Sequence, residues 1–184
     1  MAPSIGTHEI GPSNASLKAL TTKAGLGARL AHDLTLEAKA WSGSIVLDNA
    51  NLAASNVEVT VAAASLAVVD STGGVKPLSD GDRREIASNI SEKALLTTEY
   101  PDITFRSTSI SGQSGAFTVT GDLTIKGTTR PISLAVTVGD DGQVTVRATV
   151  VQTQFGIKPY SAMLGTLKIS DAVEVRATLT LPAS

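Results

Sequence analysis

Apolar and polar residues alternate along much of the second half of the chain. Apolar residues occupy every second position from Phe117 to Ile125, with Gly121 in the same row, and Thr and Asp fill the positions between them. After a turn that contains Gly127, the alternation resumes from Ile132 to Val138. A period of two is typical of half-buried antiparallel strands, and glycine can adopt the positive φ that a tight turn requires. The pattern predicts two strands with one face packed against, or enclosing, something apolar.

Similar segments bounded by Gly, Pro, Asn and Ser predict further strands before and after this pair. They cover residues 16–23, 28–41, 44–47, 56–63, 103–110, 144–150 and 172–181, with a turn at Ser42–Gly43. Residues 1–15 form a lead-in in which His8–Ile10 pairs as an edge. We predict an all-β fold in a single domain, 1–184: a closed antiparallel eight-stranded barrel, because closure removes exposed sheet edges. A β-sandwich is the alternative.

One helix interrupts the strands, at about residues 80–95. Ser79 is a suitable N-cap, and Asp82 three residues later completes a variant of the capping box. Ile86, Ile90 and Ala94 follow at intervals of four and form a narrow apolar stripe. This stripe predicts that the helix lies on a surface, either outside the barrel or at its mouth.

Composition changes this picture in one respect. Aromatic residues make up only 3% of the chain, whereas hydrophobic residues make up 42%. Packed cores of this size usually rely more on aromatic volume. Small aliphatic walls suit an interior that the protein does not fill with its own side chains. The net charge of −2 and the absence of a basic block give no electrostatic reason to expect nucleic acid binding.

The sequence offers little for catalysis or metal binding. It has two histidines, His8 and His32, no cysteine, and no acidic residues at metal-ligand spacing. It lacks a Gly-x-Ser-x-Gly elbow, a phosphate-binding loop and a His-Glu-x-x-His motif. We therefore expect no catalytic residues, no metal and no cofactor.

The first residues show neither a basic segment nor the apolar core of a secretory signal, and the chain has no apolar run of transmembrane length. These features predict a cytoplasmic protein without a membrane span.

Several motifs together resemble the YceI family of polyisoprenoid-binding, lipocalin-like proteins. The motifs are His32–Leu34, Tyr100–Ser107, Thr120–Gly127 with Thr129–Pro131, and Phe155–Ile157. The resemblance runs from about His32 to the last strand. It implies an elongated barrel whose apolar lumen takes a long isoprenoid chain, such as a polyprenyl phosphate or a quinone tail. It implies a carrier or sequestering protein rather than an enzyme. Many members of the family are exported, and the resemblance leaves a homodimer open.

Combined with the alternation, the resemblance predicts which side chains meet the ligand. The segment Gln154–Leu164 would serve as a flap or plug at the mouth, and Met163 would suit an adaptable lining. The alternative is a filled core and ordinary loop packing. The predicted ligand-binding residues are Leu34, Leu36, Phe105, Phe117, Val119, Leu123, Ile125, Leu134, Val136, Phe155, Tyr160, Met163 and Val175.

A charged headgroup would need donors near the mouth. Arg83 and Arg84 lie in the first turn of the predicted helix, whose N-terminal end favours anions, and Lys76 precedes them. His32 at a strand start is a further candidate donor. The alternatives are a solvated helix face and a local structural role for His32.

Two other functions remain open from the sequence. One is an enzyme that acts on such a lipid, with His32, Asp33 and Arg83 near the mouth. The other is a stress-related interaction module with a filled barrel, in which the helix face binds a partner.

Overall fold

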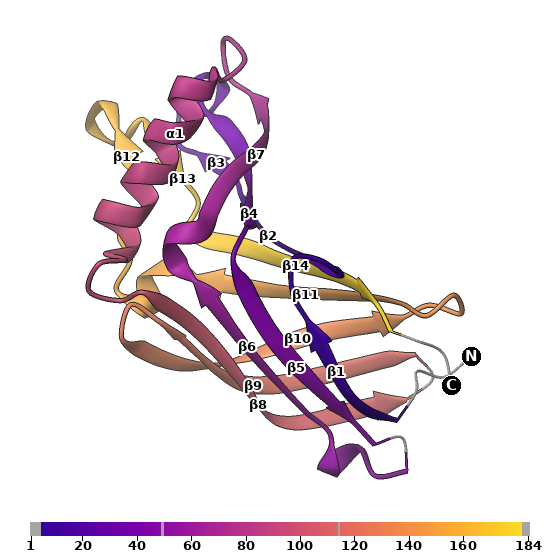
Figure 1. Ribbon diagram of the computed structural model, residues 1–184. Coiled ribbons are helices and arrows are strands. Elements are labelled where there is room, and N and C mark those ends of the chain that lie inside the picture. Colours follow the sequence, from indigo (N-terminus) through magenta and orange to yellow (C-terminus); the bar gives the residue numbers. More distant parts are fainter. Residues whose placement is uncertain (1–4, 49, 114, 182–184) are drawn as a thin grey trace.

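A large curved sheet forms the body of the protein (Figure 1). The structure is a computed structural model that describes residues 5–48, 50–113 and 115–181. The sheet has 11 strands, and all the pairings are antiparallel. In spatial order they are β1 (Gly6–Ile10), β5 (Trp41–Leu47), β6 (Asn56–Ala62), β8 (Asp102–Gln113), β9 (Ala116–Ile125), β10 (Thr128–Val138), β11 (Gln143–Val151), β14 (Ala172–Thr180), β2 (Ala15–Thr21), β4 (His32–Ala38) and β7 (Leu66–Gly73).

The prediction of a closed eight-stranded barrel is wrong. Within the described residues, β1 pairs only with β5 and β7 pairs only with β4, so the ladder has two free ends. The sheet is an open half-barrel. The all-β class and the helix are confirmed.

The reason is one long two-stranded ribbon. β4 continues through Lys39 and Ala40 into β5, and β6 continues through a 3₁₀ turn at Ala63–Ser65 into β7. Hydrogen bonds from Lys39 N to Ser65 O (3.2 Å) and from Ala62 N to Ala40 O (3.0 Å) keep the two strands together at this bend. The half formed by β5 and β6 lies at one end of the sheet, and the half formed by β4 and β7 lies at the other. The two halves of the ribbon therefore form opposite ends of the sheet and do not pair with each other to close a barrel.

The turn predicted at Ser42–Gly43 is wrong for the same reason, because both residues belong to β5. A Cβ on Gly43 would lie 2.8 Å from the backbone oxygen of Glu58 on the neighbouring strand. This glycine permits a close approach between strands and does not end one.

The hairpin between β9 and β10 is confirmed. Ile125 pairs with Thr128, so Lys126 and Gly127 alone form the loop, and both have positive φ (50° and 70°). Positive φ at both positions is what a two-residue hairpin turn of the primed kind requires.

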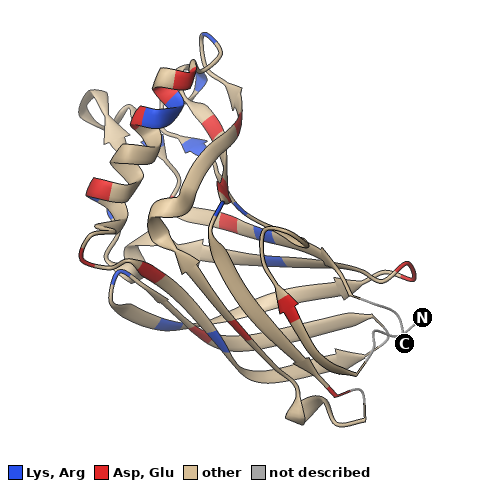
Figure 2. Ribbon diagram, in the orientation of Figure 1, with Lys and Arg blue, Asp and Glu red and all other residues tan. Residues whose placement is uncertain are grey.

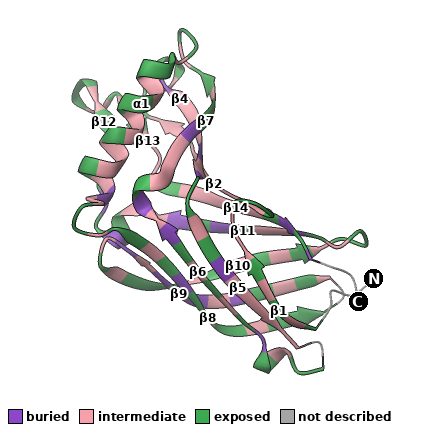
Figure 3. Cartoon of the chain, in the orientation of Figure 1, coloured by how far each residue is buried: buried purple, intermediate pink, exposed green. Residues whose placement is uncertain are grey.

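The helix is confirmed as well. α1 spans Asp80–Asn89 and continues as a π-helical turn, Ile90–Leu95. Ser79 and Asp82 form the expected capping box. α1 packs along β7 and stays largely open to solvent, whereas Leu95 at the end of the π-helical turn is buried (Figure 3).

A second, three-stranded sheet lies beside α1. It consists of β12 (Ser161–Ala162), β13 (Leu167–Ile169) and β3 (Lys23–Ala24), in that order. We call residues 23–30 and 158–169 the corner; they include this sheet and 3₁₀ turns at Ala28–Leu30 and Met163–Gly165. Figure 1 shows the loop after β12 projecting from the molecule next to α1. No helix in the described part of the chain has the length and apolar character needed to cross a membrane.

Candidate functional site

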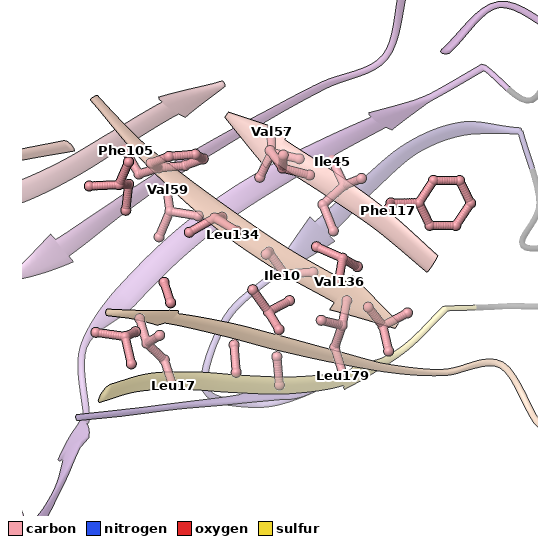
Figure 4. A pocket seen from close by; sticks show the side chains of 18 of the residues that line it. Ile10, Leu17, Ile45, Val57, Val59, Phe105, Phe117, Leu134, Val136 and Leu179 are labelled. Carbon is pink, nitrogen blue, oxygen red and sulfur yellow. The ribbon is translucent and has the colours of Figure 1, made fainter. Parts of the chain in front are cut away.

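The concave side of the half-barrel encloses a cavity of about 610 Å³. Its walls come mainly from strands β1, β2, β5, β6, β8, β9, β10, β11 and β14, and Ala38 of β4 and Leu66 of β7 also line it. Figure 4 shows side chains from these strands pointing toward one common space, and the side chains drawn there contain only carbon. The site is therefore a property of the whole sheet and not of one loop.

Cross-strand pairing explains how alternate residues make one continuous wall. Leu134 pairs with Val119 and Val136 pairs with Phe117 between β9 and β10. Phe105 pairs with Leu123 between β8 and β9. Residues opposite one another on paired strands point to the same face, so each apolar row continues on the next strand.

The lining is strongly apolar. Lys18 and Asp140 are the ionisable residues among the lining positions that the structure describes; the others are mainly Val, Leu, Ile and Ala. A wall of this kind favours apolar groups of many shapes, because the hydrophobic effect has no preferred direction.

Trp41 is the one tryptophan of the chain and lines the cavity at the start of β5. Its indole Nε1 is buried and has no hydrogen-bond partner within the described residues. The ring thus lies in an apolar setting, where its fluorescence responds to a change in its surroundings.

A packed cluster borders the cavity. Phe155, Ile157 and Leu95 are buried and pack with lining residues such as Phe105 and Ile125. Phe155 is 1% exposed and is the largest fully buried side chain of the described residues. The loop after β11 and the π-helical turn therefore supply packed core beside the hollow part.

The cavity brings together most of the predicted ligand-binding residues. The ones that line it are Phe105, Phe117, Val119, Leu123, Ile125, Leu134, Val136 and Val175.

The other predicted ligand-binding residues lie elsewhere. Leu36 is buried between Ala19 and Val68 of the neighbouring strands, and Leu34 is half-buried on the same strand. Phe155 belongs to the packed cluster, and Tyr160 and Met163 are exposed in the corner. A flap formed by Tyr160 and Met163 over the cavity is not what the structure shows.

Several lining residues are not among the predicted ligand-binding residues. Val57, Val59 and Val61 alternate within the predicted strand 56–63 and so share one face, whereas β1 and β2 carry weaker patterns. The residues missed in this way include Ile10, Leu17, Trp41, Ile45, Val57, Val59, Val61, Val146 and Leu179.

None of the four predicted headgroup residues lines the cavity. A ring nitrogen of His32, Nε2, is 2.9 Å from the backbone oxygen of Lys76, and Arg83 Nη1 donates to Val68 O over 3.4 Å. Lys76 and Arg84 are exposed. These residues lie around the start of α1 and the paired ends of β4 and β7, where His32 pairs with Gly73. Figure 2 shows charged residues of both signs along α1. Their role toward a headgroup stays a prediction.

Asp82 lies at this helix start and its carboxylate is held ionised. The Ser79 backbone N–H donates to Asp82 Oδ2 over 2.8 Å, and the Ser79 hydroxyl donates to the same oxygen over 2.8 Å. The backbone bond is the main reason that the pKa of Asp82 is lowered from its ordinary value of 3.8, with the hydroxyl second.

Asp33 also has a structural use. It accepts a hydrogen bond from Lys23 N over 2.7 Å, and its other oxygen is 3.7 Å from Lys23 Nζ. Across the described residues, no group of three or more His, Asp or Glu side chains is arranged to hold a metal ion.

Comparison with known proteins identifies the family. The model of the YceI-like domain matches residues 12–181. Protein YceI of Shigella flexneri is 33% identical over 107 residues, which is 56% of this chain and 49% of that protein. A UPF0312 protein of Photorhabdus laumondii is 31% identical over 106 residues, 57% of this chain and 48% of its own. The chain thus spans about half the length of the curated relatives it matches, and their names carry no enzymatic activity.

One solved structure supports the fold. BcnA of Burkholderia cenocepacia superposes with a TM-score of 0.69 at 19% identity, covering 91% of this chain and 96% of that chain. A YceI protein of Campylobacter jejuni has a TM-score of 0.49 at 19% identity, covering 81% and 84%. With the family match extending over nearly all of the described sheet, the chain belongs to the YceI-like family.

Proposed function

We propose that this protein binds a long-chain isoprenoid lipid, of the polyprenyl phosphate or quinone type, in the cavity of the half-barrel and carries or sequesters it. The observation that supports the proposal is the cavity itself, which is lined almost entirely by aliphatic side chains. A hollow interior also argues against an interaction module with a filled core. No contact of His32 or Asp33 favours the enzyme alternative, since both hold local structure.

The size and chemistry of the cavity fit such a ligand. A volume of about 610 Å³ lies within the range of roughly 300–1,000 Å³ that small-molecule sites occupy. Each buried methylene-sized group of a prenyl chain would contribute about 0.8 kcal/mol. Because this contribution is non-directional, we expect related chains of different length to bind with similar affinity per group.

The test uses Trp41 as a built-in reporter. Titration of the purified protein with a prenyl lipid should change its tryptophan fluorescence, and native mass spectrometry should give the stoichiometry. In Ala177→Phe, a ring would fill part of the cavity, because Ala177 lines it on β14. We expect this variant to bind at least about tenfold more weakly, since each lost methylene contact weakens binding.

Thr178→Phe is the matched control, because Thr178 is exposed on the same strand and does not line the cavity. It should bind like the unmodified protein. If Ala177→Phe bound equally well, or if no prenyl lipid bound at all, the proposal would be rejected.

A separate measurement addresses the headgroup. A triple variant, Lys76→Gln with Arg83→Gln and Arg84→Gln, should weaken binding of a polyprenyl phosphate but not of the matching polyprenol, since charge-assisted contacts are lost only for the phosphate. Equal affinities of the variant and the unmodified protein for the phosphate would remove these residues from the proposal and leave the cavity in place.

A further inference from the structure

The corner carries a group of exposed apolar side chains that the cavity does not use. Leu26 is 97% exposed and Leu164 is 107% exposed, and Leu30, Tyr160 and Met163 are also largely exposed. Single exposed apolar residues are normal on protein surfaces, but a group of large ones marks an interaction site.

Hydrogen bonds bring the two loops that carry these residues together. Gly27 N donates to Thr166 O over 2.7 Å, which joins the loop of Leu26 to the loop of Leu164. Below this bond, Ala24 pairs with Lys168 where β3 meets β13. The apolar side chains of both loops therefore belong to one surface although they are far apart in the sequence.

The backbone of the second loop is fixed in an unusual form. Met163 and Leu164 both have positive φ, 50° and 54°, a region that non-glycine residues seldom adopt. Thr166 Oγ1 donates to Met163 O over 2.8 Å, and Thr166 N donates to the same oxygen over 3.2 Å. The loop thus presents Leu164 at its tip in a defined conformation.

The charges of the corner have one sign. Residues 22–32 and 154–170 contain no Asp or Glu, whereas the chain as a whole has a net charge of −2. Arg29, Lys158 and Lys168 are exposed there, and no ion pair within the described part of the chain neutralises them. Lys23 at the base of the corner pairs with Asp33.

From these observations we infer that the corner docks onto the surface of an anionic lipid bilayer, with Leu26 and Leu164 entering the acyl boundary. Apolar tips surrounded by cations are the arrangement that combines insertion of side chains with attraction to anionic headgroups. Tyr160 is an exposed amphipathic ring of the corner, and such rings are enriched at the headgroup level of membranes. An acidic protein partner would need only the cations and would leave the two projecting leucines unexplained.

The experiment is flotation of the full chain with vesicles of phosphatidylcholine that do or do not contain phosphatidylglycerol. We expect binding to the anionic vesicles, weaker binding at high salt because the charges are screened, and little binding to pure phosphatidylcholine. The double variant Leu26→Ser with Leu164→Ser should lower the bound fraction at least about tenfold, because two apolar side chains no longer leave water.

Ile5→Ser is the matched control, since Ile5 is also exposed but precedes β1, outside the corner. It should bind like the unmodified protein. Reversing the cations with Arg29→Glu and Lys168→Glu should abolish the preference for anionic vesicles. Binding of the leucine variant equal to that of the unmodified protein would overturn the inference, and so would failure of the unmodified protein to bind either vesicle.

A second readout tests insertion directly. In a Trp41→Phe background, Leu164→Trp should be quenched by lipids brominated in the acyl chain, while Ile5→Trp should not. Absence of quenching at position 164 with retained flotation would show purely electrostatic attachment and would contradict the inference. Neither assay depends on a ligand in the cavity, so its result is independent of the proposed function.

Discussion

The curved sheet buries its apolar side chains, whereas the corner exposes them to solvent. In the sheet, long paired strands direct Val, Leu and Ile toward a shared interior, and the largest buried side chain packs there. In the corner, strands of two or three residues support loops whose Leu and Met side chains face solvent. Figure 3 shows the same contrast along the ribbon.

The difference indicates which region of the chain contributes most to the free energy of folding and which contributes little. Burial of apolar surface is the main source of folding free energy, so the sheet with its packed cluster should determine global stability. The corner keeps apolar groups in water and two residues in unfavourable backbone conformations. A region of this kind is best explained by an interaction, and the following changes test that contrast.

The largest effect is expected from Phe155→Ala in the packed cluster. Removing a fully buried aromatic ring leaves a cavity and should lower the free energy of unfolding by about 3–5 kcal/mol. Chemical denaturation followed by circular dichroism measures the change.

Tyr160→Ala in the corner is the comparison, because Tyr160 is 57% exposed. It should change stability by no more than about 0.5 kcal/mol. Similar losses in both variants would show that the corner is part of the stabilising core and would end the contrast.

Two glycine-to-alanine substitutions should change the stability of the protein in opposite directions. A Cβ on Gly121 in β9 would lie 2.5 Å from both Arg106 O and the ring of Phe105, so Gly121→Ala should cost about 1–3 kcal/mol. In α1, the nearest atom to a Cβ on Gly81 is Ser79 Oγ at 3.6 Å. Gly81→Ala should therefore stabilise by about 0.5–1 kcal/mol through helix propensity. Thermal unfolding of both variants is the measurement, and a loss in Gly81→Ala would contradict the open position of α1.

Substitution of Leu164 in the Met163–Gly165 turn of the corner should have a smaller effect on stability. Leu164 has a φ of 54°, a left-handed conformation that costs a non-glycine residue roughly 1–2 kcal/mol. Leu164→Gly removes this strain but adds freedom to the unfolded chain, so a net gain of up to about 1 kcal/mol is expected. Leu164→Ala keeps the strain and should give no gain in a denaturation experiment. Equal stabilities of the two variants would show that the loop is not strained.

The smallest effect concerns pH at the start of α1. Because the pKa of Asp82 is lowered by the Ser79 hydrogen bonds, its stabilising contribution is present above the ordinary value of 3.8 and is lost as pH falls through the lower folded-state pKa. The amide signal of Ser79 in NMR spectra should shift in this acidic range. Asp82→Asn should abolish the shift, while Asp80→Asn should retain it.

Much of the fold could be predicted from local sequence patterns. The alternation from Phe117 to Val138 placed a hairpin and one wall of the cavity correctly, since strand faces and turn residues are set by neighbours in sequence. Ser79 and Asp82 located the helix start by the same kind of local rule.

Features that depend on distant partners escaped the prediction. Whether a ladder closes depends on which strands meet, and the continuation of β4 through Lys39 and Ala40 into β5 cannot be read from periodicity. Likewise, Phe155 and Tyr160 are both aromatic residues of one irregular segment. Only the tertiary packing places Phe155 in the core and Tyr160 in solvent.

The two free ends of the sheet have a mechanical consequence. In a closed barrel, strand number and stagger fix the radius. In the part of the chain that the structure describes, the ladder ends at β1 and β7, so no hydrogen-bonded seam between these two strands fixes the width of the interior. If the cavity binds a lipid as proposed, a wider ligand would be accommodated by a small change in sheet curvature spread over many residues, without loss of hydrogen bonds between strands.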